Sequence, residues 1–204
     1  SVVRVLTEDG RVVGRARTQP APDDPATGLA VVPITPLVGE SLQARYVAVA
    51  TAWGHAPSDP VPFAPAEGAA VSVEIPRGGS VRVTALDAAT QTRIPARVRF
   101  KGLDGATVPD LGPDWRAAGA HDVVVMPEGS ATVPLPPGKY RVVVSHGPEW
   151  TLHAEVVTVT ATARADVRAE LQHAVDPGPW VGCDLHVHAA PSPDSRVSLA
   201  DRVA

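Results

Sequence analysis

Hydrophobic and polar residues alternate along much of this chain, which is typical of strands that bury one side. Residues 81–85 read Val-Arg-Val-Thr-Ala, and residues 96–101 read Ala-Arg-Val-Arg-Phe-Lys. The same period recurs in 165–171, where Ala, Val and Leu alternate with Asp, Arg and Glu. A period of two puts every second side chain on one face of a strand. These segments are therefore predicted to be strands with one buried and one solvated face.

Further strand-like runs are separated by Gly, Pro and Asp, which mark turns. Residues 8–10, Glu-Asp-Gly, are predicted to form a hairpin turn, and 20–28 a proline-broken loop. Residues 102–120 have no clear period and are predicted to be a long loop. Further strands are predicted at 2–7, 10–17, 29–35, 42–52, 69–76, 131–135, 138–145 and 149–160.

This rhythm predicts a mostly β protein made of two tandem, small antiparallel β-sandwiches. The first module is assigned to 1–77 and the second to 78–172, with the break near the Ile-Pro-Arg-Gly-Gly stretch at 75–79. A linker is assigned to 173–179. Residues 180–204 change character: a strand, a proline-rich loop and a helix beginning at Ser198 are predicted, which would be the first unit of an α/β fold.

Composition narrows the classes of protein. The chain has 204 residues, is 44% hydrophobic and carries 22 prolines and 17 glycines, so cores can form but long helices are not expected. Its net charge of −4 comes without a basic block in the sequence, which argues against a nucleic-acid platform. No apolar run approaches the roughly 20 residues that span a bilayer. Cys183 is the single cysteine, so no internal disulfide forms.

The origin and location of the chain are less defined. Abundant Ala, Val, Pro and Arg suggest a bacterial genome rich in G and C. The first residue is not Met, and the last residues stop within a pattern, so we expect a fragment of a longer protein. An exported and a cytoplasmic location both stay open.

The chemically distinctive stretch is Gly-Cys-Asp-Leu-His-Val-His at 182–188. On a strand, Asp184, His186 and His188 would share one face, opposite an apolar face that includes Cys183. Burial of the apolar face would then present a carboxylate and two imidazoles together.

The loop after this strand supplies a further candidate ligand. Pro191 and Pro193 stiffen it, and Asp194 can turn back toward the histidines. Imidazole and carboxylate donors suit Zn, Mn or Fe. Asp184 is either a direct ligand or a group that orients His186. The competing interpretation is a pair of surface histidines that bind nothing.

Residues 184–203 resemble the opening motif of the PHP (polymerase and histidinol phosphatase) superfamily of metallohydrolases. That resemblance implies a (β/α) barrel with divalent metal ions, with His186 and His188 as paired ligands, Asp194 as a following ligand, and Asp184 in a less defined role. The Pro-Pro-Gly-Lys-Tyr run at 136–140 resembles carboxypeptidase-regulatory-like β-sandwich modules, which precede the hydrolase domain in a carbaryl-hydrolase-like branch.

These resemblances imply that the parent protein is a hydrolase of phosphoesters or related small-molecule esters, with accessory β-sandwiches. The later metal ligands would lie beyond Ala204, so the fragment itself is expected to be inactive. The alternative is a non-enzymatic β-sandwich that serves as a spacer, an adhesion module or a carbohydrate-binding module. A carbohydrate platform would use several of Trp53, Trp115, Trp150 and Trp180 on one face, although core packing is the more ordinary use of tryptophan.

Overall fold

The computed structural model describes residues 1–21, 27–34, 45–64, 70–112, 119–180, 183 and 185–199. Thirteen strands form within these ranges, and no helical element does. The prediction of a mostly β protein is confirmed. The predicted barrel start is not seen: only Leu199 is helical, and residues 200–204 lie outside the described ranges. No helix in the described ranges is long and apolar enough to cross a membrane.

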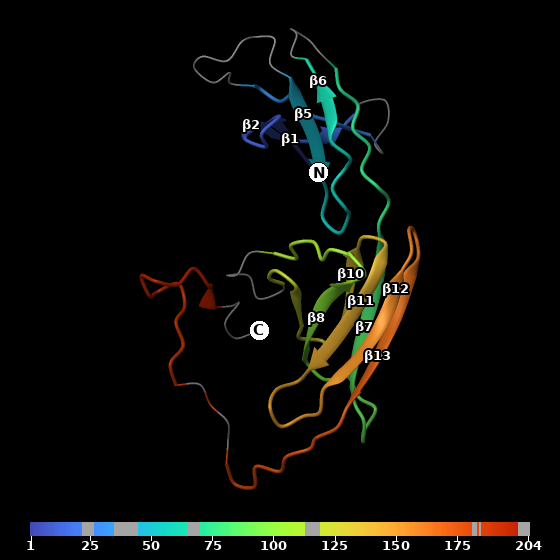
Figure 1. The fold of residues 1–204 in the computed structure, drawn as a ribbon. Coiled ribbons are helices and arrows are strands. Elements are labelled where there is room, and N and C mark those ends of the chain that lie inside the picture. Colours follow the sequence, from blue (N-terminus) through green and yellow to red (C-terminus); the bar gives the residue numbers. More distant parts are fainter. Residues whose placement is uncertain are drawn as a thin grey trace. The chain divides into compact units, whose positions relative to one another are not determined.

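The chain forms two compact units, Ser1–Arg77 and Gly78–Ala204. Unit 1 contains one four-stranded antiparallel sheet in the order β2-β1-β5-β6, visible in Figure 1. Its strands are β1 (Val2–Thr7), β2 (Val12–Arg17), β5 (Tyr46–Thr51) and β6 (Val61–Phe63). A two-stranded ribbon joins β3 (Gln19–Pro20) to β4 (Gly28–Leu29).

Unit 1 has a small core beside its central strands. Val5, Tyr46, Ala48 and Ala50 are buried, and the Tyr46 ring lies 6.2 Å from that of Phe63. The β1–β2 turn matches the predicted Glu-Asp-Gly hairpin, because the Gly10 amide donates to the Thr7 carbonyl at 2.9 Å.

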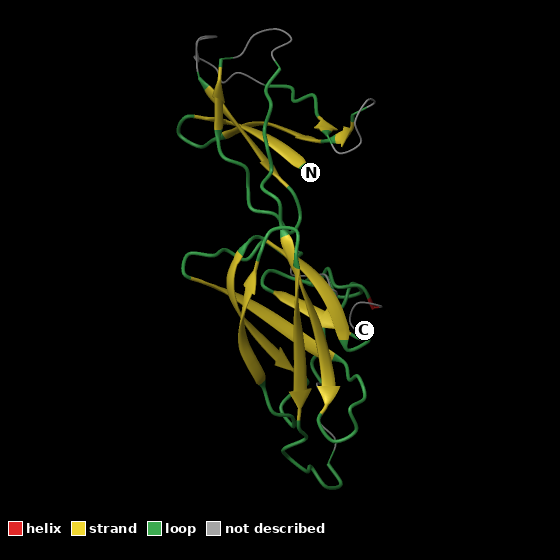
Figure 2. Cartoon of the chain, turned by 90° about the vertical axis from the view of Figure 1, so that its right-hand side faces the viewer, coloured by secondary structure: helices red, strands yellow, loops and turns green. Residues whose placement is uncertain are grey.

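Unit 2 contains two sheets that pack face to face (Figure 2). One sheet has the order β10-β7-β13 and the other the order β12-β11-β8-β9. The strands of the first are β7 (Gly79–Asp87), β10 (Ser130–Leu135) and β13 (Arg164–Leu171). The strands of the second are β8 (Ala96–Leu103), β9 (Val123–Met126), β11 (Gly138–Ser145) and β12 (His153–Val159).

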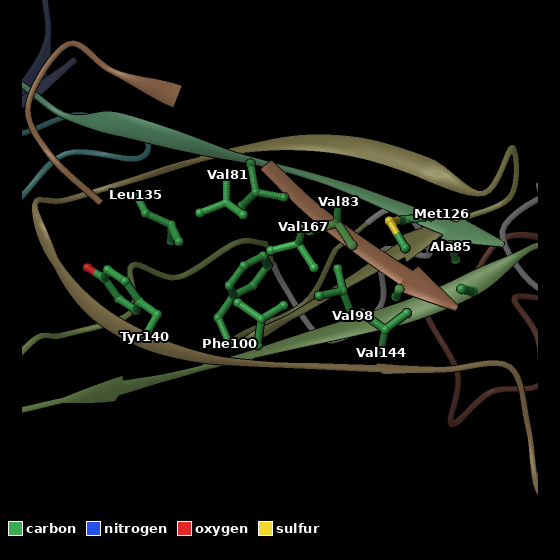
Figure 3. Close-up of a cluster of buried hydrophobic side chains, with 14 of the residues drawn as sticks. Val81, Val83, Ala85, Val98, Phe100, Met126, Leu135, Tyr140, Val144 and Val167 are labelled. Carbon is green, nitrogen blue, oxygen red and sulfur yellow. The ribbon is translucent and has the colours of Figure 1, made fainter. Parts of the chain in front are cut away.

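The core of unit 2 fills the space between these sheets (Figure 3). Period-two alternation directs every second residue inward, as predicted for β7, β8 and β13. Phe100 and Tyr140 are its largest members, and most of the others are Val, Ala or Leu. Both sheets contribute, with Val81, Val83, Ala85, Val133, Leu135, Val167, Ala169 and Leu171 from one and Ala96, Val98, Phe100, Met126, Tyr140, Val142, Val144 and Val159 from the other.

The pairing of β7 with β13 is parallel, unlike the predicted antiparallel arrangement. The register runs from Arg164 opposite Ser80 to Leu171 opposite Asp87. Every other strand pair in the described ranges is antiparallel. Parallel neighbours run in the same direction, so the start of β7 and the end of β13 lie at opposite ends of the sheet.

Tyr140 fastens the turn that the Pro-Pro-Gly motif makes between β10 and β11. Its buried hydroxyl donates to the Pro136 carbonyl at 2.9 Å, and the Thr107 carbonyl lies 3.2 Å from the same oxygen. Burial raises the pKa of the Tyr140 phenol, because the anion would lose its hydration. The buried Tyr140 side chain thus stabilises the turn between β10 and β11 through its hydroxyl group.

Two predicted strands of the first module are largely absent. Within 29–35 only Leu29 belongs to a strand, residues 30–34 are irregular, and residue 35 lies outside the described ranges. Residues 70–76 form no strand at all. Residues 69–76 are apolar and alternating, but Pro76 and the glycines at 78 and 79 adjoin them at the boundary between the units. Proline removes a donor that a strand ladder needs.

Candidate functional site

The histidine segment does not form the predicted strand. Cys183 and residues 185–189 have irregular backbone, whereas residues 181, 182 and 184 lie outside the described ranges. The side proposed to be apolar and buried faces solvent: Leu185 is 92% exposed, Val187 is 47% exposed, and Cys183 is exposed. The prediction failed because seven residues of apolar alternation specify a strand only where a partner strand and a core receive it.

The imidazoles of His186 and His188 nevertheless lie against each other. Their ring centroids are 4.9 Å apart with the planes 23° from parallel, and their Nε2 atoms are 2.8 Å apart. Asp194 Oδ1 lies 2.9 Å from the Nδ1 of His188. The hydrogen bond from His188 lowers the pKa of the Asp194 carboxyl, which is exposed.

A compact loop returns Asp194 to His188. The Ser192 amide donates to the Ala189 carbonyl at 2.7 Å, and the Ala190 amide donates to the Val197 carbonyl at 2.6 Å. These two bonds fold 189–197 back on itself, so the carboxylate lies beside a ring six residues earlier.

The three side chains form an ordered chain of hydrogen bonds. If the Nδ1–H of His188 donates to Asp194, the Nε2 of His188 is free of hydrogen and accepts the Nε2–H of His186. The same two Nε2 atoms suit a shared ion, because bonds of about 2.0–2.1 Å place nitrogens close together. Asp194 holds the far nitrogen of His188, which is where a carboxylate orients a ligand rather than binding the ion.

Metal binding itself stays a prediction. Within the ranges described, no group of three or more His, Cys, Asp or Glu side chains is arranged to hold an ion. Asp184, the fourth predicted ligand, lies outside the described residues. Zn, Mn and Fe are the ions that the donor set favours.

Zinc titration followed by histidine ring NMR tests this prediction. We expect the His186 and His188 signals to shift together, and the double change His186→Ala with His188→Ala to weaken binding by about a hundredfold or more. His121→Ala is the control, since His121 is exposed and its Nδ1 lies 4.0 Å from Asp110 Oδ1. Equal zinc affinity in the double variant and the wild type would show that the pair binds no metal.

Trp150 marks a second cluster, at one end of the unit 2 sandwich. It packs against the core, with the His146 ring at 4.9 Å and the His173 ring at 5.1 Å. The Nε2 of His173 lies 3.4 Å from Glu149 Oε2. These groups close the loop 146–152 over the end of the sandwich, so they serve packing.

A hollow of about 590 Å³ opens beside this cluster. Its walls are mainly apolar, with the prolines at 95, 127 and 148 and Leu152, and Arg97 and His146 add polar groups. Sequence reasoning missed it because its walls come from three separate segments of the chain.

Comparisons with known proteins found solved structures of low similarity. No protein-family model and no curated protein matches the chain. GBS52, the minor pilin of Streptococcus agalactiae, is 11% identical over 90% of this chain and 86% of its own, with a TM-score of 0.39. The shaft pilin SpaA of Lactobacillus rhamnosus GG is 12% identical over 87% and 86%, with a TM-score of 0.40. BcpA, the major pilin subunit of Bacillus cereus, is 14% identical over 85% and 55%, with a TM-score of 0.37. Similarity at this level assigns neither a family nor a function.

The prediction of a PHP-type metallohydrolase is nevertheless wrong on these findings. No helical element of the implied barrel forms in the described ranges, and no family model matches the chain. The strand on which the resemblance depended is also missing from residues 185–189. The hydrolase activity and the ester and phosphoester substrates were inferred from that resemblance, so they are withdrawn as well.

Proposed function

We propose that this chain is a non-enzymatic β-sandwich spacer, in which unit 2 separates the segments attached to its two ends. The observation that carries the proposal is the parallel pairing of β7 with β13. These are the first and last strands of the sandwich, so the chain enters at one end of a sheet and leaves at the other.

The length of the paired strands sets the separation. From Ser80 to Leu171 the register spans eight paired positions. At a rise of about 3.3 Å per residue, the two attachment points are about 25 Å apart. An antiparallel pair of terminal strands would instead bring both attachment points to one end and leave the module as a side branch.

The contact between the first and last strands is well anchored. Val167, Ala169 and Leu171 of β13 and Val81, Val83 and Ala85 of β7 are all buried. Gly79 lets the turn before β13 approach the start of β7, because a Cβ there would overlap backbone and side-chain atoms of residues 159–163. The parallel register is therefore fixed at its first position.

We infer that the two units are tandem β-modules, of which unit 1 has a single four-stranded sheet and unit 2 the two-sheet sandwich. The compact units are Ser1–Arg77 and Gly78–Ala204, and each has its own buried residues. This arrangement supports the break between residues 77 and 78, whereas the boundary between the second module, 78–172, and the segment from 173 onward stays a prediction.

A distance measurement tests the spacer geometry. We expect spin labels on Ser80→Cys and Gln172→Cys, in a Cys183→Ser background, to report a narrow distribution near 25 Å by pulsed electron resonance. The matched control is Ser80→Cys with Arg164→Cys, which face each other across the ladder and should give strong short-range broadening. Short distances for both pairs would exclude the parallel arrangement and the spacer with it.

A further inference from the structure

The outer face of the β8–β11 sheet is strongly basic. Alternation along β8 directs Arg97, Arg99 and Lys101 outward, while Val98 and Phe100 face the core. On β11 the same side carries Lys139 and Arg141. We call these five residues the basic face; all of them are exposed. They form no block in the sequence, because the strand period and the strand register bring them together.

The register places like charges opposite each other. Arg141 pairs directly with Lys101, and Val143 pairs with Arg99. Cross-strand partners have Cβ atoms about 4.5–5.5 Å apart, and like charges at that distance destabilise a sheet. The chain as a whole is acidic, with a net charge of −4, so this pair of positive charges is not a consequence of composition. Because the pair also opposes folding, we infer that it has a role other than stabilising the sheet.

Charge on this face is only partly neutralised. Arg99 lies 3.5 Å from Asp122, and Lys139 lies 3.1 Å from Asp104. Within the described parts of the chain, Arg97, Lys101 and Arg141 have no ion-pair partner. Three exposed cations are thus available to a ligand on neighbouring strands about 4.8 Å apart.

The basic face runs into the hollow beside Trp150. Arg97 belongs to both, and Ser145, opposite Arg97 on β11, also lines the hollow. The hollow is open to solvent and has a volume of about 590 Å³. Its proline and leucine walls can pack against the apolar C–H face of a sugar ring, and the described residues that line it include no Phe, Tyr or Trp.

We propose that the basic face and the hollow together bind an acidic polysaccharide. One sugar ring would occupy the hollow, and the carboxylates of the following sugars would lie along Arg97, Lys101 and Arg141. Bound carboxylates also remove the repulsion between Lys101 and Arg141. This binding goes beyond the spacer function and does not depend on it.

Binding of an oligogalacturonate to the full chain, measured by calorimetry over a range of salt concentrations, tests the proposal. Lys101→Thr with Arg141→Thr should reduce the slope of log affinity against log salt by roughly two, one for each cation removed. The same variant should melt at or above the wild-type temperature, because the like-charge pair is gone. Leu152→Ser should lower the affinity without changing the salt slope, since it alters only a wall of the hollow.

Arg82→Thr with Arg93→Thr is the matched control, because it removes two positive charges that lie outside the basic face. We expect wild-type affinity and slope from it. If this control lost as much affinity as Lys101→Thr with Arg141→Thr, the loss would follow from net charge alone, and the basic face would not be the binding site. Polyglutamate or a single-stranded oligonucleotide that binds as tightly as the oligogalacturonate would overturn the carbohydrate assignment, as would no binding at low salt.

Discussion

Leu171→Asp is expected to unfold unit 2 at neutral pH. The Leu171 side chain is fully buried at the end of β13, inside the core between the two sheets. A carboxyl buried in such surroundings has its pKa raised by about 3–5 units, which corresponds to roughly 4–7 kcal/mol. Domains of this size are stable by only about 5–15 kcal/mol. Loss of the buried leucine side chain costs about 2–5 kcal/mol more, so the change removes most or all of the stability of the sandwich.

Hydrogen exchange of the full chain, followed by mass spectrometry, measures this effect in each unit separately. Peptides from β7, β8 and β11 should lose their protection, while peptides from β1 and β5 of unit 1 keep theirs. The folded-state pKa of the introduced carboxyl is raised, so its penalty is full above that pKa and declines as the pH falls toward about 4.

Leu152→Asp is the matched control, since Leu152 is 68% exposed. The same chemical change there should alter stability by less than about 0.5 kcal/mol. If Leu171→Asp left the protection of β7 unchanged, β13 would not be part of the sandwich core.

The strands that sequence alone predicted well are those with strict alternation. The segments now seen as β7, β8 and β13 were predicted because their buried and exposed residues follow a period of two. Alternation tells which side of a strand is buried, but not which strand is its neighbour. The parallel pairing of β7 with β13, on which the spacer proposal depends, is set by contacts between residues more than 80 positions apart and leaves no trace in either segment.

The histidine segment shows the converse limit. Cys183, Leu185 and Val187 alternate with polar residues as a half-buried strand would, yet all three are exposed. The closeness of Asp194 to His188 was foreseeable, because the prolines at 191 and 193 favour a turn. The closeness of the two imidazoles was also predicted, but it arises on an irregular backbone and not on the predicted strand.

The basic face was missed for a related reason. Its five cations are spread over 97–101 and 139–141 and are interrupted by Val, Phe and Tyr, so no run of the sequence is unusually basic. Only the register of β8 against β11 brings Lys101 opposite Arg141. The absence of a basic block in the sequence therefore does not exclude a basic surface on the folded protein.

A second large effect is expected under mechanical load. Pulling at the start of β7 and the end of β13 loads the ladder between them along the strand direction, in shear. The eight paired positions then resist together, because their hydrogen bonds lie across the direction of force. Pulling at Asp104 and Lys139, at the shared end of the antiparallel neighbours β8 and β11, instead opens the ladder one pair at a time.

Forced unfolding of single molecules is the most direct measurement of whether unit 2 can act as a spacer. The full chain carries Cys183→Ser and is held through Ser80→Cys and Gln172→Cys, or through Asp104→Cys and Lys139→Cys. Since several hydrogen bonds must break at once only in the first geometry, we predict unfolding there at roughly several times the force of the second. Equal forces, or a weaker first geometry, would contradict the parallel connection of β7 and β13 and the spacer function that rests on it.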